Sequence, residues 1–404
     1  MKIVIMNDLL VCGGAEMQSR REKELLESNG HEVYLLTYDY DFPRNHNFYK
    51  SDNGFFNIPI KNSGINKIKR KLFFDEILYS KTRAILKRLN PDIIHVNNLY
   101  LAPITQYKSL DGFNVVQTIR DYSAVCPLST CIYKDYTICK GIKYNNCNLR
   151  CSSYKTPIKK YMYDTVYELR KKYVDKFICP SEKLTEYCKD HSYNIECINN
   201  PFDFSKLEKF KKAIDHNTKK YMYYGAINEE KGVFKLLEAF NKFSKNKNVK
   251  LIIAGKANKT SLDKLKLYLN NNKIEYLGFL SYDKIIKKLE EVYSVIVPSL
   301  WMENYPNTVL EGMCTECLVL GSNRGGIPDM LKDDKGIIFD VLDINDIVNA
   351  LEKSYNIDIQ QYKKIINKSK KYAIYNNSIE KYYERLINCF NDVIAYKKFN
   401  INKK

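Results

Sequence analysis

The stretch MENYPNTVLEGM, residues 302–313, contains two glutamates on either side of a predicted helix start. Glu303 lies in a loop, and Glu311 lies inside the apolar run that follows Asn307. A helix that begins near Asn307 points its free backbone N–H groups and the positive end of its dipole at this loop, which suits a diphosphate. A carboxylate only accepts hydrogen bonds, so Glu303 and Glu311 suit the hydroxyl groups of a sugar and a ribose. The stretch therefore predicts a nucleotide-sugar site.

Strand and helix patterns alternate on both sides of this stretch. In the first half we predict strands at residues 2–7, 91–98, 113–121, 175–181 and 195–200, and a glycine turn, a helix and a strand over 12–38. The same order restarts at residues 220–243, 249–258, 273–292, 293–300, 317–331 and 336–340. Repeated β-α units form parallel sheets that bind ligands at the carboxyl ends of their strands. The predicted fold class is α/β, with two Rossmann-like domains that face each other across a deep cleft.

The predicted domain limits follow this repetition and the length of 404 residues, which is too long for one ordinary core. We expect an N-terminal, acceptor-side domain over residues 1–200, with a cysteine-rich insert at 126–151. A nucleotide-sugar-binding domain is expected over residues 201–375. Residues 376–404 carry apolar side chains at helical spacing and are predicted to form an amphipathic helix that packs back on the body.

Two further segments of the second half carry glycines and a lysine at predicted strand ends. In YYGAINEEKGV, Gly225 lets a ligand approach the backbone closely, and Lys231 provides a point charge for a phosphate. In SNRGGIPDML, Gly325 and Gly326 predict a tight loop, and Pro328 suits the start of the next helix. Each segment alone is only a weak indication of a nucleotide-sugar site. The order and spacing of the segments relative to the glutamate pair make the indication much more specific.

With these motifs the chain resembles the retaining nucleotide-sugar glycosyltransferases of family four, which have the two-domain GT-B fold. ENYPNTVLE matches the Glu-x7-Glu motif of the family, and GAINEEKG matches its glycine–basic–EKG motif. CGGAE matches its N-terminal glycine loop, and GGIPD matches its GG-I-P-E loop. The resemblance covers nearly the whole chain and implies a retaining, metal-independent hexosyl- or N-acetylhexosaminyltransferase that requires no cofactor.

The resemblance also implies roles for single residues. Gly13 and Gly14 would lie against the donor diphosphate, which Lys231 would bind and stabilise as it leaves. Glu303 would contact the donor sugar as part of the catalytic site, and Glu311 would hold the ribose. The remaining donor-binding positions are expected at Gly225, Asn304, Tyr305, Asn307 and Thr308.

Two positions depart from the family pattern. The family usually has an arginine directly after the first glycine of the EKG motif. This chain has Ala226 there, so the phosphate clamp lacks one charge unless Lys256 or Arg324 supplies it. The usual His-Asp pair is Arg120-Asp121 here. Arginine is not a base at neutral pH, so we expect Arg120 to bind a sugar hydroxyl or a phosphate in the catalytic site. A non-catalytic scaffold that lost donor binding is the alternative.

Five cysteines follow this pair, and they are Cys126, Cys131, Cys139, Cys147 and Cys151. Tetrahedral zinc needs four thiolates or imidazoles, which this segment contains, although its spacing differs from the short Cys-x2-Cys of common zinc sites. Buried or free thiols and disulfides are the alternatives. A metal here would be structural and would shape the acceptor side of the cleft without entering the chemistry.

The charge and the apolar pattern suggest where the protein acts. Residues 61–89 are basic with interleaved apolar residues, and they predict either a helix that contacts an anionic membrane surface or an ordinary surface helix. With no recognisable signal peptide and no apolar run of transmembrane length, we expect a cytoplasmic protein that is peripheral on the inner face of the cell membrane if residues 61–89 bind lipid.

The expected partners are a nucleotide sugar, with UDP favoured because it is the commonest donor nucleotide of the family, and a glycan or lipid-linked acceptor. Such a reaction would build a bacterial surface polysaccharide or glycoconjugate. The formal net charge of +18 suggests a remote alternative, a basic nucleic-acid-binding protein. That alternative lacks any recognition motif and leaves the two glutamates unexplained, because carboxylates repel phosphates, so no nucleic-acid partner is expected.

Overall fold

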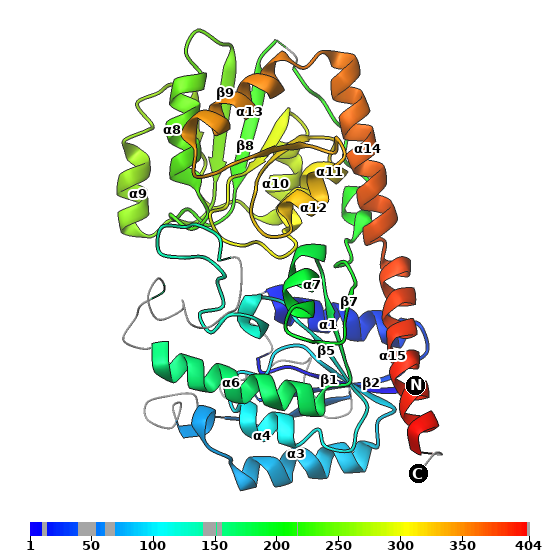
Figure 1. Ribbon diagram of the computed structural model, residues 1–404. Coiled ribbons are helices and arrows are strands. Elements are labelled where there is room, and N and C mark those ends of the chain that lie inside the picture. Colours follow the sequence, from blue (N-terminus) through cyan, green and yellow to red (C-terminus); the bar gives the residue numbers. More distant parts are fainter. Residues whose placement is uncertain are drawn as a thin grey trace.

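The computed structural model contains two β-sheets, one above the other in Figure 1, each covered by helices on both faces. It describes residues 1–9, 14–38, 54–60, 69–139, 151, 156–215 and 217–401. The first sheet has seven strands in the order β3-β2-β1-β4-β5-β6-β7, and neighbouring strands are parallel. They are β1 (Lys2–Met6), β2 (Glu32–Thr37), β3 (Phe55–Asn57), β4 (Ile93–Val96), β5 (Val115–Thr118), β6 (Lys176–Cys179) and β7 (Ile195–Cys197).

The first sheet is buried on both faces because its strands are nearly continuous apolar runs. Ile3 and Ile5 of β1 enter one hydrophobic cluster with α1 and α15, whereas Val4 and Met6 enter another with α3, α4 and α7. Strands that are apolar on both faces pair in parallel and are joined by helices. The helices of this half are α1 (Gly14–Ser28), α3 (Glu76–Leu89), α4 (Pro103–Lys108), α6 (Thr156–Tyr173), α7 (Glu182–Lys189) and α15 (Ile379–Ile401).

The second sheet has six parallel strands in the order β10-β9-β8-β11-β12-β13. They are β8 (Lys219–Tyr224), β9 (Val249–Ala254), β10 (Ile274–Tyr276), β11 (Ser294–Val297), β12 (Leu318–Ser322) and β13 (Ile337–Phe339). Its helices are α8 (Val233–Phe243), α9 (Lys259–Lys266), α10 (Tyr282–Leu289), α11 (Asn307–Cys314), α12 (Ile327–Leu331), α13 (Ile344–Asn356) and α14 (Ile359–Asn377). Parallel pairing brings the carboxyl ends of the strands, and the loops after them, to one edge of the sheet.

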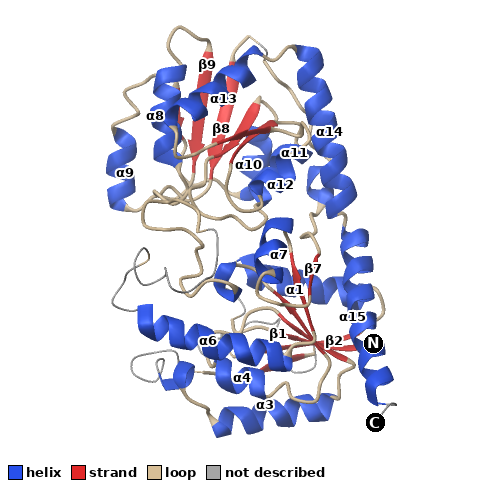
Figure 2. Ribbon diagram, in the orientation of Figure 1, coloured by secondary structure: helices blue, strands red, loops and turns tan. Residues whose placement is uncertain are grey.

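The chain crosses between the two halves twice, once near residues 200–202 and once between α14 and α15. The two crossing segments contact each other at Asn377. The buried side chain of Asn377 donates a hydrogen bond from Nδ2 to the carbonyl oxygen of Asn200 at 2.7 Å. Its own carbonyl oxygen accepts the N–H of Phe202 at 2.8 Å. Helices α14 and α15, which Figure 1 and Figure 2 show along one side of the molecule, follow each other across this point.

The α/β fold class with two Rossmann-like sheets is confirmed, and every predicted strand is present. The helix predicted near Asn307 begins at that residue. The three-residue edge strand β3 was not predicted, because so short a run carries no alternation of apolar and polar residues. The structure ends α14 at Asn377 and begins α15 at Ile379, so the predicted helix over 376–404 starts later than expected. The domain limits stay predictions.

The prediction of a single amphipathic helix over residues 61–89 is wrong, because the described part of this segment is interrupted at residues 73–75. Residues 61–68 lie outside the described residues, and residues 69–72 are helical. The chain leaves the helix at Phe73, and α3 then begins after Asp75. The Oδ1 atom of Asp75 accepts the N–H of Leu78 at 3.0 Å, which is the capping bond that starts a new helix.

Phe390 is expected to anchor α15 against the first sheet, because its ring is fully buried and lies 5.3 Å from the ring of His95. Phe390→Ala should lower the free energy of unfolding by roughly 3–5 kcal/mol through lost burial and a cavity, as measured by urea denaturation. Tyr396→Ala on the same helix is the control, because its side chain is 70% exposed, and it should cost less than about 0.5 kcal/mol. Equal losses of unfolding free energy in the two variants would show that the buried face of α15 stabilises the protein no more than its exposed face.

Candidate functional site

A cavity of about 830 Å³ lies between the two halves, within the size range of small-molecule sites. The N-terminal half contributes α1 and the loops after β4, β5, β6 and β7. The C-terminal half contributes the start of α10, the loop after β11 and the first turns of α11. Its lining includes seven residues of the predicted site, namely Arg120, Asp121, Glu303, Asn304, Tyr305, Asn307 and Glu311.

Glu303 and Lys231 form an ion pair at the edge of this cavity. The Nζ atom of Lys231 lies 2.6 Å from Oε1 of Glu303, and the hydroxyl of Ser299 donates to the same oxygen at 2.9 Å. The two side chains are 38% and 17% exposed, so water and ligands reach the pair. The structure therefore joins two residues that the sequence assigned to different parts of a donor.

The start of α11 supplies further hydrogen-bond donors beside Lys231. Pro306 is the residue before the helix, and no side chain caps the first turn. Asn307 and Thr308 line a smaller hollow of about 230 Å³ together with Gly225 and Lys231. Glu303, Pro306 and Asn307 line both hollows, which are therefore neighbours. Free N–H groups of a helix start and a lysine ammonium together favour a bound anion.

Glu311 is held deeper in the same wall. Its side chain is buried, and its Oε2 atom accepts the hydroxyl hydrogen of Tyr224 at 2.8 Å. Burial first, and then the charge of Glu311, raise the pKa of Tyr224, so its hydroxyl stays protonated and keeps donating. This bond fixes the orientation of a carboxylate that also lines the cavity.

Gly325 and Gly326 support the Glu303 loop from behind. The N–H of Gly326 donates to the carbonyl oxygen of Glu303 at 2.7 Å. A β-carbon at Gly325 would lie 1.9 Å from that oxygen, and one at Gly326 would lie 2.0 Å from the carbonyl oxygen of Asn304. Gly325 also has a φ of +56°, which side chains rarely adopt. The predicted tight loop is thus needed for direct backbone contact.

Arg120 lies on the opposite wall and is largely committed to neighbouring amides. Its Nε and Nη2 atoms donate to Oδ1 of Asn97 at 3.0 and 2.7 Å, and its Nη1 atom lies 3.5 Å from Oδ1 of Asn200. Its carbonyl oxygen accepts Nδ2 of Asn304 at 2.9 Å, which links the two halves. Asp121 accepts the N–H of Ser123 at 2.8 Å and starts a short helical turn.

The two residues proposed to replace the missing clamp charge do not line the cavity among the described residues. The Nζ atom of Lys256 lies 4.6 Å from the centre of the Phe279 ring. The side chain of Arg324 is only 2% exposed, and burial lowers the pKa of its guanidinium. The structure therefore gives no support to either residue as the replacement charge, and this role stays a prediction.

The structure adds lining residues that the sequence did not single out. Gln18 and Arg21 reach the cavity from α1, and Tyr282 and Trp301 reach it from the other half. Gln18 and Arg21 follow Gly14 at helical spacing, so all three share one side of α1. That spacing after the glycine loop was the signal in the sequence that could have identified them.

Several predicted positions gain no structural description or support. Gly13 and Cys147 lie outside the described residues, and Gly14 is the first residue of α1.

Within the described part of the chain, no group of three or more possible metal ligands is arranged to hold an ion. Instead, a hydrogen bond from the Cys131 thiol lowers the pKa of Cys126 to about 5. The structural zinc therefore has no support from the described residues.

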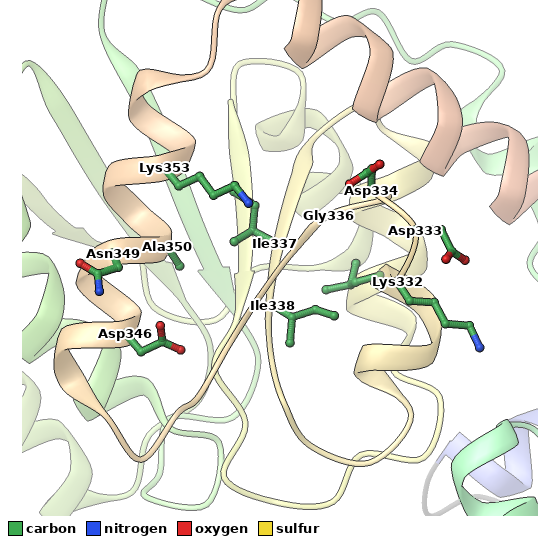
Figure 3. A pocket seen from close by; sticks show the side chains of 11 residues that line it. Lys332, Asp333, Asp334, Gly336, Ile337, Ile338, Asp346, Asn349, Ala350 and Lys353 are labelled. Atoms are coloured by element: carbon green, nitrogen blue, oxygen red, sulfur yellow. The ribbon is translucent and has the colours of Figure 1, made fainter.

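A separate hollow of about 340 Å³ lies on the C-terminal half (Figure 3). Asp346 and Asn349 of α13 stand on one side of it, and Lys332 and Asp333 stand on the other. None of the predicted site residues is among the described residues that line it. The predicted donor residues thus gather in the cleft and not in this hollow.

Comparison with known protein families gives two matches that together span most of the chain. The family described as "Glycosyltransferase Family 4" matches residues 12–206, and "Glycosyl transferases group 1" matches residues 204–372. The uncharacterized glycosyltransferase MJ1607 of Methanocaldococcus jannaschii is 27% identical over 124 residues. That alignment covers 30% of this chain and 32% of the relative, so the match spans about a third of each protein.

Solved structures share the fold over nearly the whole chain. A glycosyltransferase from Rickettsia africae is 16% identical with a TM-score of 0.72, covering 97% of this chain and 98% of that one. Anabaena HepE, solved with UDP and glucose, is 14% identical with a TM-score of 0.67, covering 97% of this chain and 99% of that one. At these identities the likeness shows the two-domain GT-B architecture.

Gly326→Ala is expected to displace the Glu303 loop, because its new methyl group would meet the carbonyl oxygen of Asn304. We expect affinity for a nucleoside diphosphate to fall by about tenfold or more, equal to about 1.4 kcal/mol, in isothermal titration calorimetry. Gly112→Ala is the control, since Gly112 has open space around it. Its φ is +82°, whereas that of Gly326 is −83°, so the control carries the greater backbone strain but no clash. Equal binding by the two variants would contradict the supporting role of Gly326.

Proposed function

The chain belongs to the family 4, group 1 glycosyltransferases, and we propose that it transfers a sugar from a nucleoside diphosphate sugar to an acceptor hydroxyl. The anomeric configuration of the sugar is retained, and no metal takes part. The observation that carries the proposal is the gathering of one lysine, one helix start and two carboxylates around connected hollows of the same cleft.

In the proposed site, each part of the donor binds one of these groups. The diphosphate binds Lys231 and the N–H groups at the start of α11, which line the smaller hollow together. The sugar hydroxyls bind Glu303, whose carboxylate borders both hollows. The ribose diol binds Glu311, which Tyr224 holds in place. Asn304, Tyr305 and Thr308 supply the backbone around the sugar and the phosphates.

The ion pair between Lys231 and Glu303 does not block the donor. Because Lys231 is more than a third exposed, such a pair is worth only about 0–1 kcal/mol. A diphosphate brings more charge to Lys231 than Glu303 does, and sugar hydroxyls replace the lysine at the carboxylate. Donor binding therefore exchanges one weak contact for two new ones.

Lys231 and the helix start also favour the chemical step. The bond between the sugar and the diphosphate breaks, a bond to the acceptor oxygen forms, and the acceptor hydroxyl loses its proton. Negative charge then collects on the leaving diphosphate, where preorganised donors stabilise it. Arg120 lies in the same cavity and is assigned to a sugar hydroxyl or a phosphate, since it is not a base at neutral pH.

We assign the donor to the UDP sugars, carrying a hexose or an N-acetylhexosamine. Support comes from Anabaena HepE, which has been solved with UDP and with UDP-glucose and shares the fold of this chain. The product of such a transfer is a surface polysaccharide or glycoconjugate of a bacterium.

The acceptor is assigned to a glycan or a lipid-linked molecule that the N-terminal half meets at an anionic membrane surface. Phe73, Phe74 and Ile77 lie around the start of α3 and are 64%, 44% and 70% exposed. The ammonium of Lys108 lies 4.9 Å from the centre of the Phe74 ring, so positive charge accompanies the apolar side chains. Among the described residues, no helix combines the length and the apolar character needed to cross a bilayer. The contact proposed here is peripheral.

A nucleotide panel tests the proposed donor. UDP, GDP, ADP, TDP and CMP are compared by thermal shift without added metal, because a ligand that binds only the folded state raises its stability. We expect one nucleoside diphosphate, UDP first, to raise the melting temperature. If none of the compounds does so, the chain is a scaffold without donor binding and the proposed function is rejected.

Glu311 is tested with the ribose diol itself. Glu311→Ala should weaken UDP roughly 10- to 100-fold, because hydrogen bonds to a charged group contribute about 1.5–3 kcal/mol. The binding of 2′,3′-dideoxy-UDP, which lacks the diol, should be unchanged by the substitution. Calorimetry on both ligands gives the comparison, and equal losses would remove Glu311 from the ribose site.

The membrane contact is tested by vesicle flotation. Wild type should float with vesicles that contain phosphatidylglycerol and not with pure phosphatidylcholine vesicles, and Phe73→Ala/Ile77→Ala should float less. Leu267→Ala is the matched control, because Leu267 is 74% exposed on the other half of the molecule. Equal flotation of the double variant and wild type would reject this surface as the contact.

A further inference from the structure

The chain carries a buried carboxylate, Asp8, just after the end of β1. The residue is only 4% exposed, and both of its carboxylate oxygens accept hydrogen bonds. Its Oδ2 atom accepts the backbone N–H groups of Tyr100 and Leu101, the latter at 2.9 Å, and its Oδ1 atom accepts Nε2 of Gln106 at 2.7 Å. Its own N–H donates to the carbonyl oxygen of Asn98 at 2.9 Å. Asp8 therefore holds the loop between β4 and α4 together with the first turn of α4.

The same loop fixes two residues on the N-terminal wall of the cleft. Asn97 accepts two N–H groups of the Arg120 guanidinium on its Oδ1 atom, and Asn98 lines the cavity itself. The hydroxyl of Tyr100 donates to Oδ2 of Asp121 at 3.2 Å. Arg120 and Asp121 thus take their positions from the loop that the buried carboxylate holds.

This wall borders the part of the cleft that the proposed function gives to the donor sugar. Arg120 and Asp121 line the larger cavity together with Glu303. Neither is among the described residues that line the smaller hollow, to which the diphosphate is assigned. The carbonyl oxygen of Arg120 accepts Nδ2 of Asn304 at 2.9 Å, so Arg120 lies beside the residue that follows Glu303. A guanidinium donates hydrogen bonds and a carboxylate accepts them, and sugar hydroxyls can meet both.

We propose that Asp8 is a positioning residue that holds Arg120 and Asp121, through the loop of residues 97–101, against the sugar of the donor. This inference rests on the proposed function, and Asp8 is not among the described residues that line the cavity. An ionised carboxylate suits this role because three N–H donors converge on it and it only accepts. A protonated acid or an amide carries a hydrogen of its own, so the loop then loses a contact.

The acidity of Asp8 makes this role visible in a pH profile. Burial raises the pKa of the Asp8 carboxyl to about 6, against its three hydrogen bonds and the positive charge of Lys71. Burial, and less strongly the charge of Asp8, raise the pKa of the Tyr38 phenol, which stays neutral. Asp8 is therefore ionised at about pH 8 and protonated at about pH 5.

The effect of this proton on stability has the opposite sign to its effect on the loop. Because the pKa of Asp8 lies above the ordinary value of 3.8, the folded chain binds the proton more tightly than the unfolded chain. Protonation of Asp8 therefore stabilises the fold as the pH falls. Weaker sugar binding at low pH would not be explained by unfolding at Asp8.

The test measures UDP and a UDP sugar by calorimetry on wild type, Asp8→Asn and Asp92→Asn. The sugar probe is whichever of UDP-glucose, UDP-galactose and UDP-N-acetylglucosamine binds wild type most tightly. Asp92 is the matched control, because its Oδ2 atom also accepts a backbone N–H, from Lys2 at 2.7 Å, but lies before β4 at the opposite end of the strands. At about pH 8 we expect Asp8→Asn to weaken the UDP sugar by about tenfold and to leave UDP unchanged, with Asp92→Asn matching wild type.

The pH profile separates positioning from a purely structural role. Between about pH 8 and about pH 5, wild type should lose affinity for the UDP sugar until it matches Asp8→Asn, whose own affinity should stay level. Hydrogen exchange at the amides of Tyr100 and Leu101 should be faster in Asp8→Asn than in wild type at about pH 8. Melting temperatures confirm that the variants are folded. If Asp8→Asn does not fold, Tyr100→Phe removes only the hydroxyl that bonds to Asp121 and should weaken the UDP sugar by a few fold.

The outcomes distinguish this inference from the proposed function. Unchanged affinity of both variants for the UDP sugar, equal losses of UDP and the UDP sugar, or parallel pH profiles of wild type and Asp8→Asn would each overturn the role of Asp8 alone. If wild type binds no nucleoside diphosphate and no UDP sugar, the proposed function fails and this inference fails with it.

Discussion

Backbone contact between the Glu303 loop and the Gly325–Gly326 turn determines the geometry of the cleft. The carbonyl oxygens of Glu303 and Asn304 lie where β-carbons of the two glycines would be, so the loops touch without any side chain between them. The hydrogen bond from the N–H of Gly326 to the carbonyl oxygen of Glu303 then holds the Glu303 loop against the glycine turn. This placement brings the Glu303 carboxylate to Lys231, 72 residues earlier in the chain. A site made from loops gains its precision from such packing on a rigid sheet.

The same loop also connects the two halves of the molecule. Asn304 accepts the hydroxyl hydrogen of Ser181 and donates to the carbonyl oxygen of Arg120, both in the N-terminal half. Tyr305 is buried, and its hydroxyl donates to Oδ1 of Asn377 at 3.2 Å, at the point where the two crossings meet. A movement of the halves therefore changes the surroundings of the residues assigned to the donor. The loop that carries Glu303 therefore contacts the N-terminal half and the crossing point at Asn377 as well as the candidate site.

Charge acts on two scales in this protein. The net charge of +18 attracts anionic donors and anionic surfaces over long distances. Inside the cleft, by contrast, carboxylates outnumber arginines. Carboxylates only accept hydrogen bonds, so this lining favours the hydroxyl groups of a ligand over the phosphates of a nucleic acid. A nucleotide sugar has both characters, with a diphosphate in the middle and hydroxyl groups on each side. In the proposed site, Lys231 and the start of α11 hold the diphosphate, and Glu303 and Glu311 bind the hydroxyl groups.

The sequence by itself determined the order of strands and helices, the start of α11 at Asn307 and the presence of a C-terminal helix, because these depend on residues that are near each other in the chain. Local motifs also indicated several of the residues that line the two hollows of the cleft. Only the tertiary structure decided the pairing of Lys231 with Glu303, the supporting role of Gly325 and the position of Arg21 on the cleft. Such contacts join distant segments, and they depend on the order of strands in each sheet and on how the two sheets face each other.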